Sequence, residues 1–531
     1  METPPTKSIY KKVGIASLIM MASVFLSRVI GLIREMVIAY IGGAGASVDS
    51  YQFAFIIPDI LNHVLASGFL AITFIPIFTG YLTRNDEKEG WRVFSLILTC
   101  FGILLAVMVV MAVVFAPQLM SLAGFKDPET LQRSIRMTRI IIPAQFFFFC
   151  GGLLTAVQYS KERFLIPALA PLIYNIGIIG GGLILGPWLG IEGFAWGVLA
   201  GAIIGNFILQ IFGARAVGMT YRPQFNFRHP DLKKYLLLTL PLMVGLTMTF
   251  STEFFFRLFG SYLPEGSVSS LNYSLRLMFV LVGLFGQAAG VASYPFLARL
   301  VSEGKISEMN HLMNRTLRFI ALAIPVSVVV IVLRKEIIRM VFQRGTFDAA
   351  ATEATAHIMI FIMIGTFAFA AQTIVSRGYY AMQNTVFPAV FGSLAVLLSI
   401  PIYMIGMNRM GVSGVALAIS ISAIFQVVAL YLLWNRKSAN TGAKSVYLFF
   451  IITILLSIPL GLLLEWLHIT LVSRIDPSDF WGSAVISFII GVVFITAFLG
   501  TGYLLGVREI KETASRIQAR IFPHTTDKSS K

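Results

Sequence analysis

Charged residues are scarce in this sequence. Asp, Glu, Lys and Arg together make up 12% of its 531 residues, whereas soluble domains carry about 25%. Hydrophobic residues make up 57% and run from one end of the chain to the other, well beyond the roughly 250–300 residues that one soluble core can organise. The sequence therefore excludes a soluble enzyme and a disordered scaffold, and it predicts an all-α, polytopic membrane protein.

Cysteine and the motifs of catalysis are also nearly absent. Cys100 and Cys150 are the only cysteines and lie in apolar runs without CxxC spacing, so we interpret them as small buried hydrophobic residues and exclude a disulfide-stapled secreted module. His63 has no second His, Cys or carboxylate at metal-ligand spacing. The sequence contains no Walker, GxSxG or HExxH motif. We expect no catalytic residue, no metal and no cofactor, and hence no enzyme.

Acidic residues are outnumbered, with 25 Asp and Glu against 41 Lys and Arg. In a soluble protein this excess would suggest nucleic acid as a partner, but in a membrane protein basic residues gather in cytoplasmic loops. With the N-terminus inside, cytoplasmic segments carry 26 of the 41 basic residues and outer loops carry 10. We therefore expect both termini in the cytoplasm and no nucleic acid as a partner. The outer loop around Arg334, Lys335, Arg339 and Arg344 runs against this rule.

Long apolar runs give the number of membrane crossings. A transmembrane helix needs about 20 mostly apolar residues, and this criterion predicts about fourteen spans. The edges of the first, second, seventh and eighth spans are the least defined, because polar residues interrupt them. The predicted spans are 13–40, 48–80, 92–116, 137–158, 165–186, 191–213, 234–260, 268–298, 316–333, 353–378, 386–407, 411–435, 445–467 and 480–505.

An internal repeat organises the chain. The segment 159–168 (YSKERFLIPA) aligns without gaps on 380–389 (YAMQNTVFPA), 221 residues later. At the same offset, 190–195 (GIEGFA) falls on 411–416 (GVSGVA). The period covers six spans, an even number, so the two halves have the same orientation and form parallel repeats around a central cavity. This architecture favours a transporter that exposes its cavity to alternate sides of the membrane.

The repeat also predicts the domain boundaries. Residues 1–218 form an N-terminal lobe of six spans, and residues 219–438 form a C-terminal lobe of six more. Two extra helices follow in 439–507, and 508–531 is a basic tail that we expect on the cytoplasmic surface of the membrane.

Several ionisable residues fall inside the predicted spans, where each costs about 2.5–3.5 kcal/mol. Glu253 and Arg257 are four residues apart and can pair on one helix face. Asp49 begins the second span, where a carboxylate suits a helix N-terminus. These residues have ordinary structural interpretations.

Arg28, Arg34 and Arg276 are harder to explain structurally. Arg28 and Glu35 share one face of the first span, and Arg34 lies roughly 120° around the helix from Arg28. Either the helix breaks near Gly31 or its two charged sides line a wide cavity. Guanidinium groups match phosphate oxygens in pairs, so three arginines with one carboxylate would make a positive site for a phosphate or pyrophosphate. The alternative is that these charges form salt bridges that hold the lobes together.

Several motifs in order resemble the MurJ/MviN family, whose members are lipid II flippases of the multidrug/oligosaccharidyl-lipid/polysaccharide exporter superfamily. The resemblance covers essentially the whole chain. The matching motifs are SRVIGLIRE at 27–35, Asp49 with Ile57-Pro58, NYSLRLM at 272–278, VFQRGTFDAAAT at 341–352 and GYYAMQNTVFP at 378–388.

The resemblance implies a bacterial inner-membrane protein that moves undecaprenyl-pyrophosphate-linked disaccharide-pentapeptide outward for peptidoglycan synthesis. By this likeness, Arg28, Arg34 and Arg276 match the arginines that contact the pyrophosphate. Glu35 matches the acid beside the second arginine, and Asp49 matches another functional acid. The last two spans would form a groove for the polyprenyl tail. The expected partners are this lipid-linked glycan and membrane lipids, and the protein is expected to be a monomer.

The chain departs from the family pattern at four positions. Asn62 and Ser67 replace charged residues in the second span, and Leu275 and Phe279 replace acids that can flank the arginine of the eighth. The alternative function is therefore a flippase for another polyprenyl-linked glycan, such as an O-antigen or exopolysaccharide unit. Two other classes of protein are less favoured. A polytopic glycosyltransferase would need a large outer loop with catalytic acids. A cation-coupled drug exporter would line its cavity with acids and aromatic residues rather than with arginines.

Overall fold

The protein is described by a computed structural model that covers residues 6–66, 68–244, 248–384 and 386–504. These residues form helices joined by short loops, without a β-strand among them. Ser67 and the basic tail 508–531 lie outside the described residues. The first half of the chain contains α1 (Thr6–Gly42), α2 (Ala46–Phe53), α3 (Ile56–Leu61), the π-helix η1 (Asn62–Ala66), α4 (Gly68–Thr83), α5 (Glu87–Val114), α6 (Ala116–Met120), α7 (Pro128–Ile141), α8 (Ala144–Ser160), α9 (Leu165–Leu189), α10 (Glu192–Gly201), η2 (Ala202–Ile208) and α11 (Leu209–Ala216).

The second half of the chain follows the same order of long and broken helices. It contains α12 (Pro230–Val244), α13 (Met248–Gly260), α14 (Ser267–Val282), the π-helix η3 (Gly283–Gln287), α15 (Ala288–Ser302), α16 (Ile306–Ile320), α17 (Ala323–Val332), α18 (Arg334–Phe342), α19 (Ala349–Met363), α20 (Thr366–Ala381), α21 (Val386–Lys437), α22 (Ala443–Val472) and α23 (Phe480–Leu504).

Every predicted span falls on one helix or on a run of broken helices. Within the described residues, nine helices are long and apolar enough to cross a membrane, and ten if the bent pair α19 and α20 counts as one span. The exact number of fourteen is not reached by this criterion but is consistent with the helix order. The second predicted span, for example, is divided among α2, α3, η1 and α4, and Pro58 near the start of α3 explains one break.

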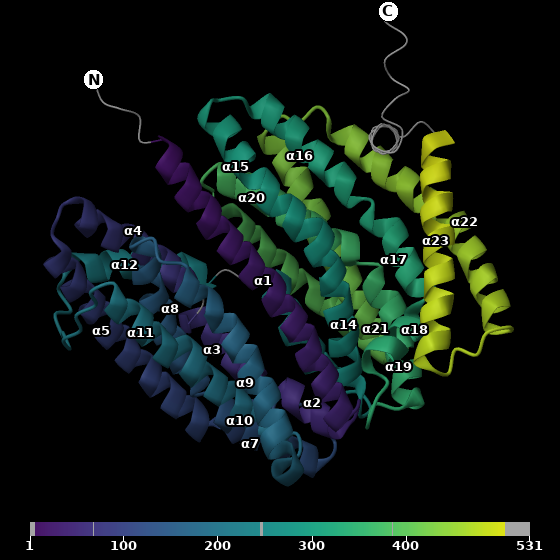
Figure 1. Cartoon of the computed structure of the whole chain (residues 1–531), viewed down its shortest axis with the longest axis horizontal. Helices are drawn as coiled ribbons and strands as arrows, with labels where there is room; N and C mark the ends of the chain where they lie inside the picture. Colours follow the sequence, from purple (N-terminus) through teal and green to yellow (C-terminus); the bar gives the residue numbers. More distant parts are fainter. Residues whose placement is uncertain (1–5, 67, 245–247, 385, 505–531) are drawn as a thin grey trace, which may run out of the picture.

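The helices gather into two bundles with α1 running between them (Figure 1). We call α1–α11 the N-lobe and α13–α21 the C-lobe. The last two helices lie at the outer edge of the C-lobe, where α22 packs on α16 and α17 and α23 packs on α18. The predicted architecture of two six-helix repeats with two additional helices is confirmed.

The backbone repeats its unusual conformations at the offset found in the sequence. Gly190 (φ 58°, ψ −134°) and Gly411 (φ 57°, ψ −130°) are 221 residues apart and share one conformation. Two pairs of residues with positive φ, Glu162 with Gln383 and Gly218 with Ala439, are separated by the same distance. The π-helices η1 and η3 are also 221 residues apart. The duplication therefore extends from sequence to local backbone geometry.

The helix α12 lies across the predicted boundary between lobes at residue 219. It packs against α4 and α5 of the N-lobe, and its Tyr235 belongs to the hydrophobic core of that lobe, with its ring 5.1 Å from that of Phe101. Its continuation α13 packs against α14 and α21 of the C-lobe. The seventh predicted span thus passes from one lobe to the other, and the division into domains stays a prediction.

The basic loop that runs against the charge rule forms α18 and carries acidic partners. The Lys335 ammonium lies 2.8 Å from a Glu353 oxygen, and an Arg334 nitrogen lies 3.9 Å from a Glu465 oxygen. The Arg339 guanidinium donates to the backbone carbonyl of Pro477 at the start of the α23 segment.

Candidate functional site

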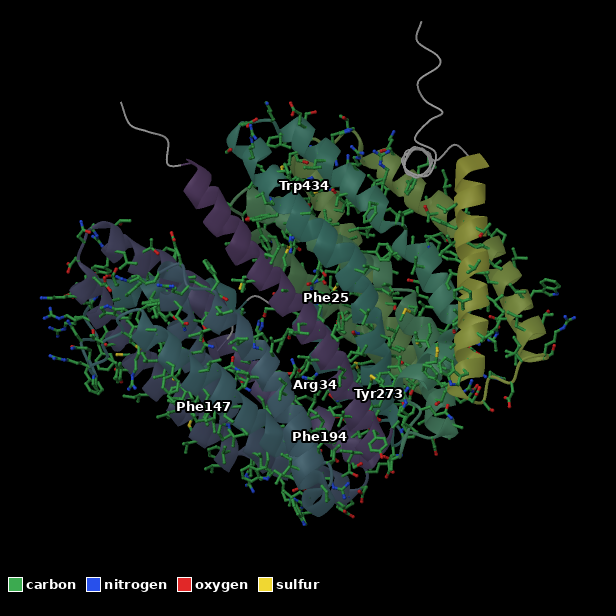
Figure 2. The ribbon with its side chains drawn as sticks, viewed as in Figure 1. Phe25, Arg34, Phe147, Phe194, Tyr273 and Trp434 are labelled. Atoms are coloured by element: carbon green, nitrogen blue, oxygen red, sulfur yellow. The ribbon has the colours of Figure 1, made fainter. Side chains whose placement is uncertain are left out.

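A cavity of about 490 Å³ lies between the two lobes. Figure 2 labels Arg34 on α1 in this position, between the bundles. The cavity walls combine charged side chains with aromatic and amide ones, drawn from α1, α2, α3 and η1 on one side and from α13 and α14 on the other. The lining residues are Arg34, Glu35, Tyr51, Gln52, Phe55, Asp59, Asn62, His63, Thr249, Phe250, Glu253, Arg257 and Arg276.

On the α1 side, Arg34 is held by two neighbours. Its guanidinium donates to the Glu35 carboxylate at 2.6 Å and to the Asn175 side-chain oxygen of α9 at 3.0 Å. The helix α1 continues unbroken from Thr6 to Gly42, so it does not break near Gly31. Arg34 and Glu35 of α1 instead line the cavity.

On the other side of the cavity, Arg276 approaches the same carboxylate. An Arg276 nitrogen lies 3.7 Å from a Glu35 oxygen, and the Asn272 amide, one turn earlier on α14, donates to the other Glu35 oxygen at 3.0 Å. Glu35 is 2% exposed. This buried carboxylate therefore connects α1 of the N-lobe with α14 of the C-lobe.

The charges continue along the cavity wall through α13 to α3. A Glu253 oxygen lies 3.0 Å from Arg276, and the other accepts from Arg257 at 2.9 Å. Arg257 also donates to Asp59 of α3 at 2.5 Å. The predicted pairing of Glu253 with Arg257 on one helix face is confirmed, but both residues also reach other helices.

The expected excess of positive charge in the cavity is not found. Three arginines line it, but the third is Arg257 rather than Arg28, and three carboxylates accompany them. The formal charges of these six side chains cancel. Sequence reasoning counted one carboxylate because Asp59 and Glu253 could not be assigned to the cavity from their positions in the chain.

Arg28 lies on α1 away from this cavity. Its guanidinium donates to the Gln287 side-chain oxygen at the end of η3, and it passes so close to Gly283 that a side chain there would collide with it. Arg28 is exposed and lies six residues before Arg34, about 9 Å further from the end of α1 at Gly42. It is another contact between the lobes.

Asp49 is buried at the end of the molecule where α1 turns into α2, and it does not line the cavity. Its carboxylate accepts from the backbone N–H groups of Gly266 and Ser269 at 2.7 Å each. The sequence predicted that this carboxylate lies at a helix N-terminus. It accepts hydrogen bonds at the N-terminus of α14 in the opposite lobe rather than at that of its own helix. The positive end of the α14 dipole explains the attraction.

Further contacts close the lobes together at the same end. The Tyr273 hydroxyl donates to the Gly43 carbonyl at 2.8 Å, and the backbone N–H of Thr346 donates to the Tyr40 carbonyl at 3.0 Å. One hydrophobic cluster runs across this end from Ile38 and Val48 to Val268. The lobes are therefore joined where α1 ends.

Sequence reasoning missed Asn175 and Asn272, which fix the Arg34–Glu35 pair, and it did not place Asp59 in the site. Asn272 carried a signal, because it belongs to the NYSLRLM motif one turn before Arg276.

His63 stacks on Phe250 with ring centroids 4.3 Å apart and lines the cavity. Within the part of the chain that the structure describes, no three His, Cys, Asp or Glu residues come together as a metal site.

The family model described as "Lipid II flippase MurJ" matches residues 38–476. The chain belongs to the MurJ family of lipid II flippases. The match includes Asp49 and Arg276 but begins after Arg28, Arg34 and Glu35, so the model does not test those three positions.

Relatives in the MurJ family align over most of the chain. The "Probable lipid II flippase MurJ" of Vibrio cholerae is 27% identical over 437 residues, 80% of this chain and 83% of that protein. Its counterpart in Haemophilus influenzae is 25% identical over 509 residues, 91% of this chain and 98% of that protein. The latter alignment is long enough that it extends outside the segment matched by the family model.

Solved structures share the fold. A structure of "Lipid II flippase MurJ, inward closed conformation" superposes with a TM-score of 0.74 at 24% identity, over 91% of this chain and 99% of that one. An inward-facing multidrug resistance MATE family transporter of the MOP superfamily reaches 0.64 at 13% identity, over 80% and 98%. The chain therefore shares the fold of these proteins, and as a member of the MurJ family it is a multi-pass membrane protein.

Proposed function

We propose that this protein moves lipid II, the undecaprenyl-pyrophosphate-linked peptidoglycan precursor, from the inner to the outer leaflet of the bacterial cytoplasmic membrane by alternating access. The observation that carries the proposal is the cavity between the lobes of a MurJ-family chain, in which Arg34 and Arg276 face one another across Glu35. Each arginine can offer paired N–H donors to a phosphate.

The arginines retain hydrogen-bonding capacity for such a cargo. The Nε atoms of Arg34 and Arg276 are buried and have no hydrogen-bond partner among the described residues. Unsatisfied donors in a buried site cost free energy, so an anionic ligand that accepts from them would be favoured. Arg28, which lies nearer the start of α1, would meet the diphosphate before the diphosphate reaches Arg34 and Arg276. Because transport makes and breaks no bond, no catalytic residue is required.

The sidedness of the protein follows from its charges in this proposal. The start of α1 and the end of α23 lie at the same end of the molecule (Figure 1), and the excess of basic residues in the predicted inner segments favours a cytoplasmic position for both termini. The lobes would then be joined at their outer ends, through Asp49 and Tyr273, in a state that receives cargo from the cytoplasm. Opening of these contacts would release it outside.

The two additional helices would hold the polyprenyl tail. Leu455 and Leu462 on α22 and Phe488 on α23 are exposed apolar side chains at the edge of the C-lobe. A monomer would be sufficient, since the cavity is built within one chain.

Complementation tests the cargo most directly. Expression of this protein should restore growth to a bacterial strain depleted of its own lipid II flippase. Failure to restore growth, with the protein present in the membrane at normal abundance, would contradict lipid II transport and favour a flippase for another polyprenyl-linked glycan.

A further inference from the structure

The ion pair between Asp59 and Arg257 joins α3 of the N-lobe to α13 of the C-lobe. The Asp59 side chain is 33% exposed, whereas those of Glu35, Glu253 and Arg257 are 3%, 14% and 5% exposed. Asp59 is therefore the carboxylate of this network that reaches furthest into open space. Moving it away from its partner costs the least, because water can solvate it on one side.

Arg257 is held in place by groups other than Asp59. Its guanidinium lies 5.2 Å from the centre of the Phe256 ring and 5.8 Å from that of Phe55. Glu253, one turn earlier on the same helix, accepts from it at 2.9 Å. The cation–π contacts and this ion pair would keep the guanidinium oriented if Asp59 moved away.

Arg257 and Arg276 are adjacent because one carboxylate bridges them. One Glu253 oxygen lies 3.0 Å from Arg276, and the other accepts from Arg257. The buried Nε atoms of both arginines also lack a hydrogen-bond partner within the described residues. Two neighbouring guanidiniums suit an anion with two linked phosphates, each of which can accept a pair of N–H groups.

The charge balance of the cavity determines how such an anion can bind. With three arginines and three carboxylates along its wall, the cavity presents no net positive charge to attract a diphosphate. Binding becomes favourable when the anion replaces a carboxylate as the partner of an arginine. Asp59 is the carboxylate most accessible for replacement.

We propose that Arg257 is a cargo-binding arginine and that Asp59 is a resident competitor, whose carboxylate occupies Arg257 until the diphosphate of the cargo replaces it. The exchange frees α3 from α13, so cargo binding and separation of the lobes are coupled through this pair. The inference rests on the proposed function and adds one residue to its binding site.

Binding of undecaprenyl diphosphate to the purified full-length protein in lipid nanodiscs tests the proposal. Asp59→Asn keeps the shape of the side chain and removes its charge, so the dissociation constant should fall about tenfold. Arg257→Gln should raise the constant about tenfold, and the double variant should bind as weakly as Arg257→Gln alone. Glu192→Gln is the matched control, because Glu192 pairs with Arg136 at 2.8 Å outside this cavity; its binding should be unchanged.

A purely structural ion pair predicts different results. Asp59→Asn and Arg257→Gln would then change binding in the same direction, and the charge-reversed variant Asp59→Arg with Arg257→Asp would restore wild-type binding. Either outcome overturns the proposal. If Arg257→Gln does not yield folded protein, Asp59→Asn decides alone, since tighter binding supports the competition and unchanged or weaker binding contradicts it.

The same assay separates this inference from the proposed function. If Arg34→Ala and Arg276→Ala abolish binding while Asp59→Asn and Arg257→Gln leave it unchanged, the inference is wrong and the proposed function stands. If wild-type protein does not bind undecaprenyl diphosphate above the level of empty nanodiscs, both are contradicted.

Discussion

At the scale of single residues, the membrane interior explains why the charges of this protein lie where they do. A charged side chain removed from water needs a partner of opposite sign, and the three arginines of the cavity have Glu35, Glu253 and Asp59 as partners. Two ion pairs of the cavity, Arg257 with Asp59 and Arg276 with Glu35, cross between the lobes, so the alternative that charges hold the lobes together is part of the structure. This role is compatible with the proposed phosphate binding, because ion pairs between lobes can be exchanged for a ligand.

Asp49 gives a prediction at this scale. Removal of its carboxylate leaves the buried N–H groups of Gly266 and Ser269 without their acceptor. Asp49→Ala should lower the free energy of unfolding by about 2–3 kcal/mol, measured by thermal unfolding in detergent. Asp49→Asn keeps one oxygen that can accept a hydrogen bond and should cost roughly half as much. Equal melting temperatures for Asp49→Ala and the wild type would contradict this interpretation.

The candidate site could be predicted in part from the sequence. Arg34, Glu35 and Arg276 stood out because a bilayer tolerates few charges, and the structure brings them together. Asp59 and Arg257 could not be paired, since they are 198 residues apart and neither has a spacing rule that links it to the other. Arg28 was expected in the same cavity but does not line it. Helix periodicity gives the angle of a residue around the helix axis, but it does not give the position of the opposite lobe.

At the scale of helices, close approach of backbones organises the N-lobe. A side chain added at Gly177 or Gly181 of α9 would lie 2.6 or 2.5 Å from the α-carbons of Gly201 and Gly197 in α10. Small residues at these positions let the helices come together, as in other membrane helix pairs. Gly180, which lies next to Gly181, faces open space.

Gly180 and Gly181 therefore provide a matched pair of variants. Gly181→Ala should lower the free energy of unfolding by about 1–3 kcal/mol, because the new methyl group overlaps the α10 backbone. Gly180→Ala adds the same methyl group where nothing lies within 4 Å and should leave stability unchanged or slightly raised. Thermal unfolding of the two purified variants compares them directly. A Gly180→Ala variant that is destabilised as strongly as Gly181→Ala would show that the contact with α10 is not the cause.

The order of the helices and their duplication were predictable, but the breaks within them were not. Hydropathy finds an apolar run whether or not its backbone is continuous, so it gave one span where the structure has α2, α3, η1 and α4. Hydropathy likewise does not distinguish the π-helices η1 and η3 from the α-helices beside them. Their matching positions in the two repeats became visible only in the backbone.

At the scale of the whole molecule, the protein has two lobes that are joined at one end and enclose a charged cavity. Asp49, Tyr273 and Thr346 fasten the end at which α1 turns into α2. The ion pairs of the cavity lie further from this end of the molecule, at Arg34 and Glu35 of α1 and at Arg276 of α14. Such an arrangement suits a rocking motion in which contacts at one end open as others form, while the arginines keep hold of the cargo.

The measurement that tests the central claim most directly is the transfer of lipid II across the membrane of liposomes that contain the purified protein. Wild-type protein should expose lipid II of the inner leaflet to an impermeant reagent outside, and the double variant Arg34→Ala with Arg276→Ala should lose at least about tenfold in rate. Glu192→Gln, outside the cavity, should transfer lipid II at the wild-type rate. A double variant as active as the wild type would contradict the assignment of these arginines to the cargo.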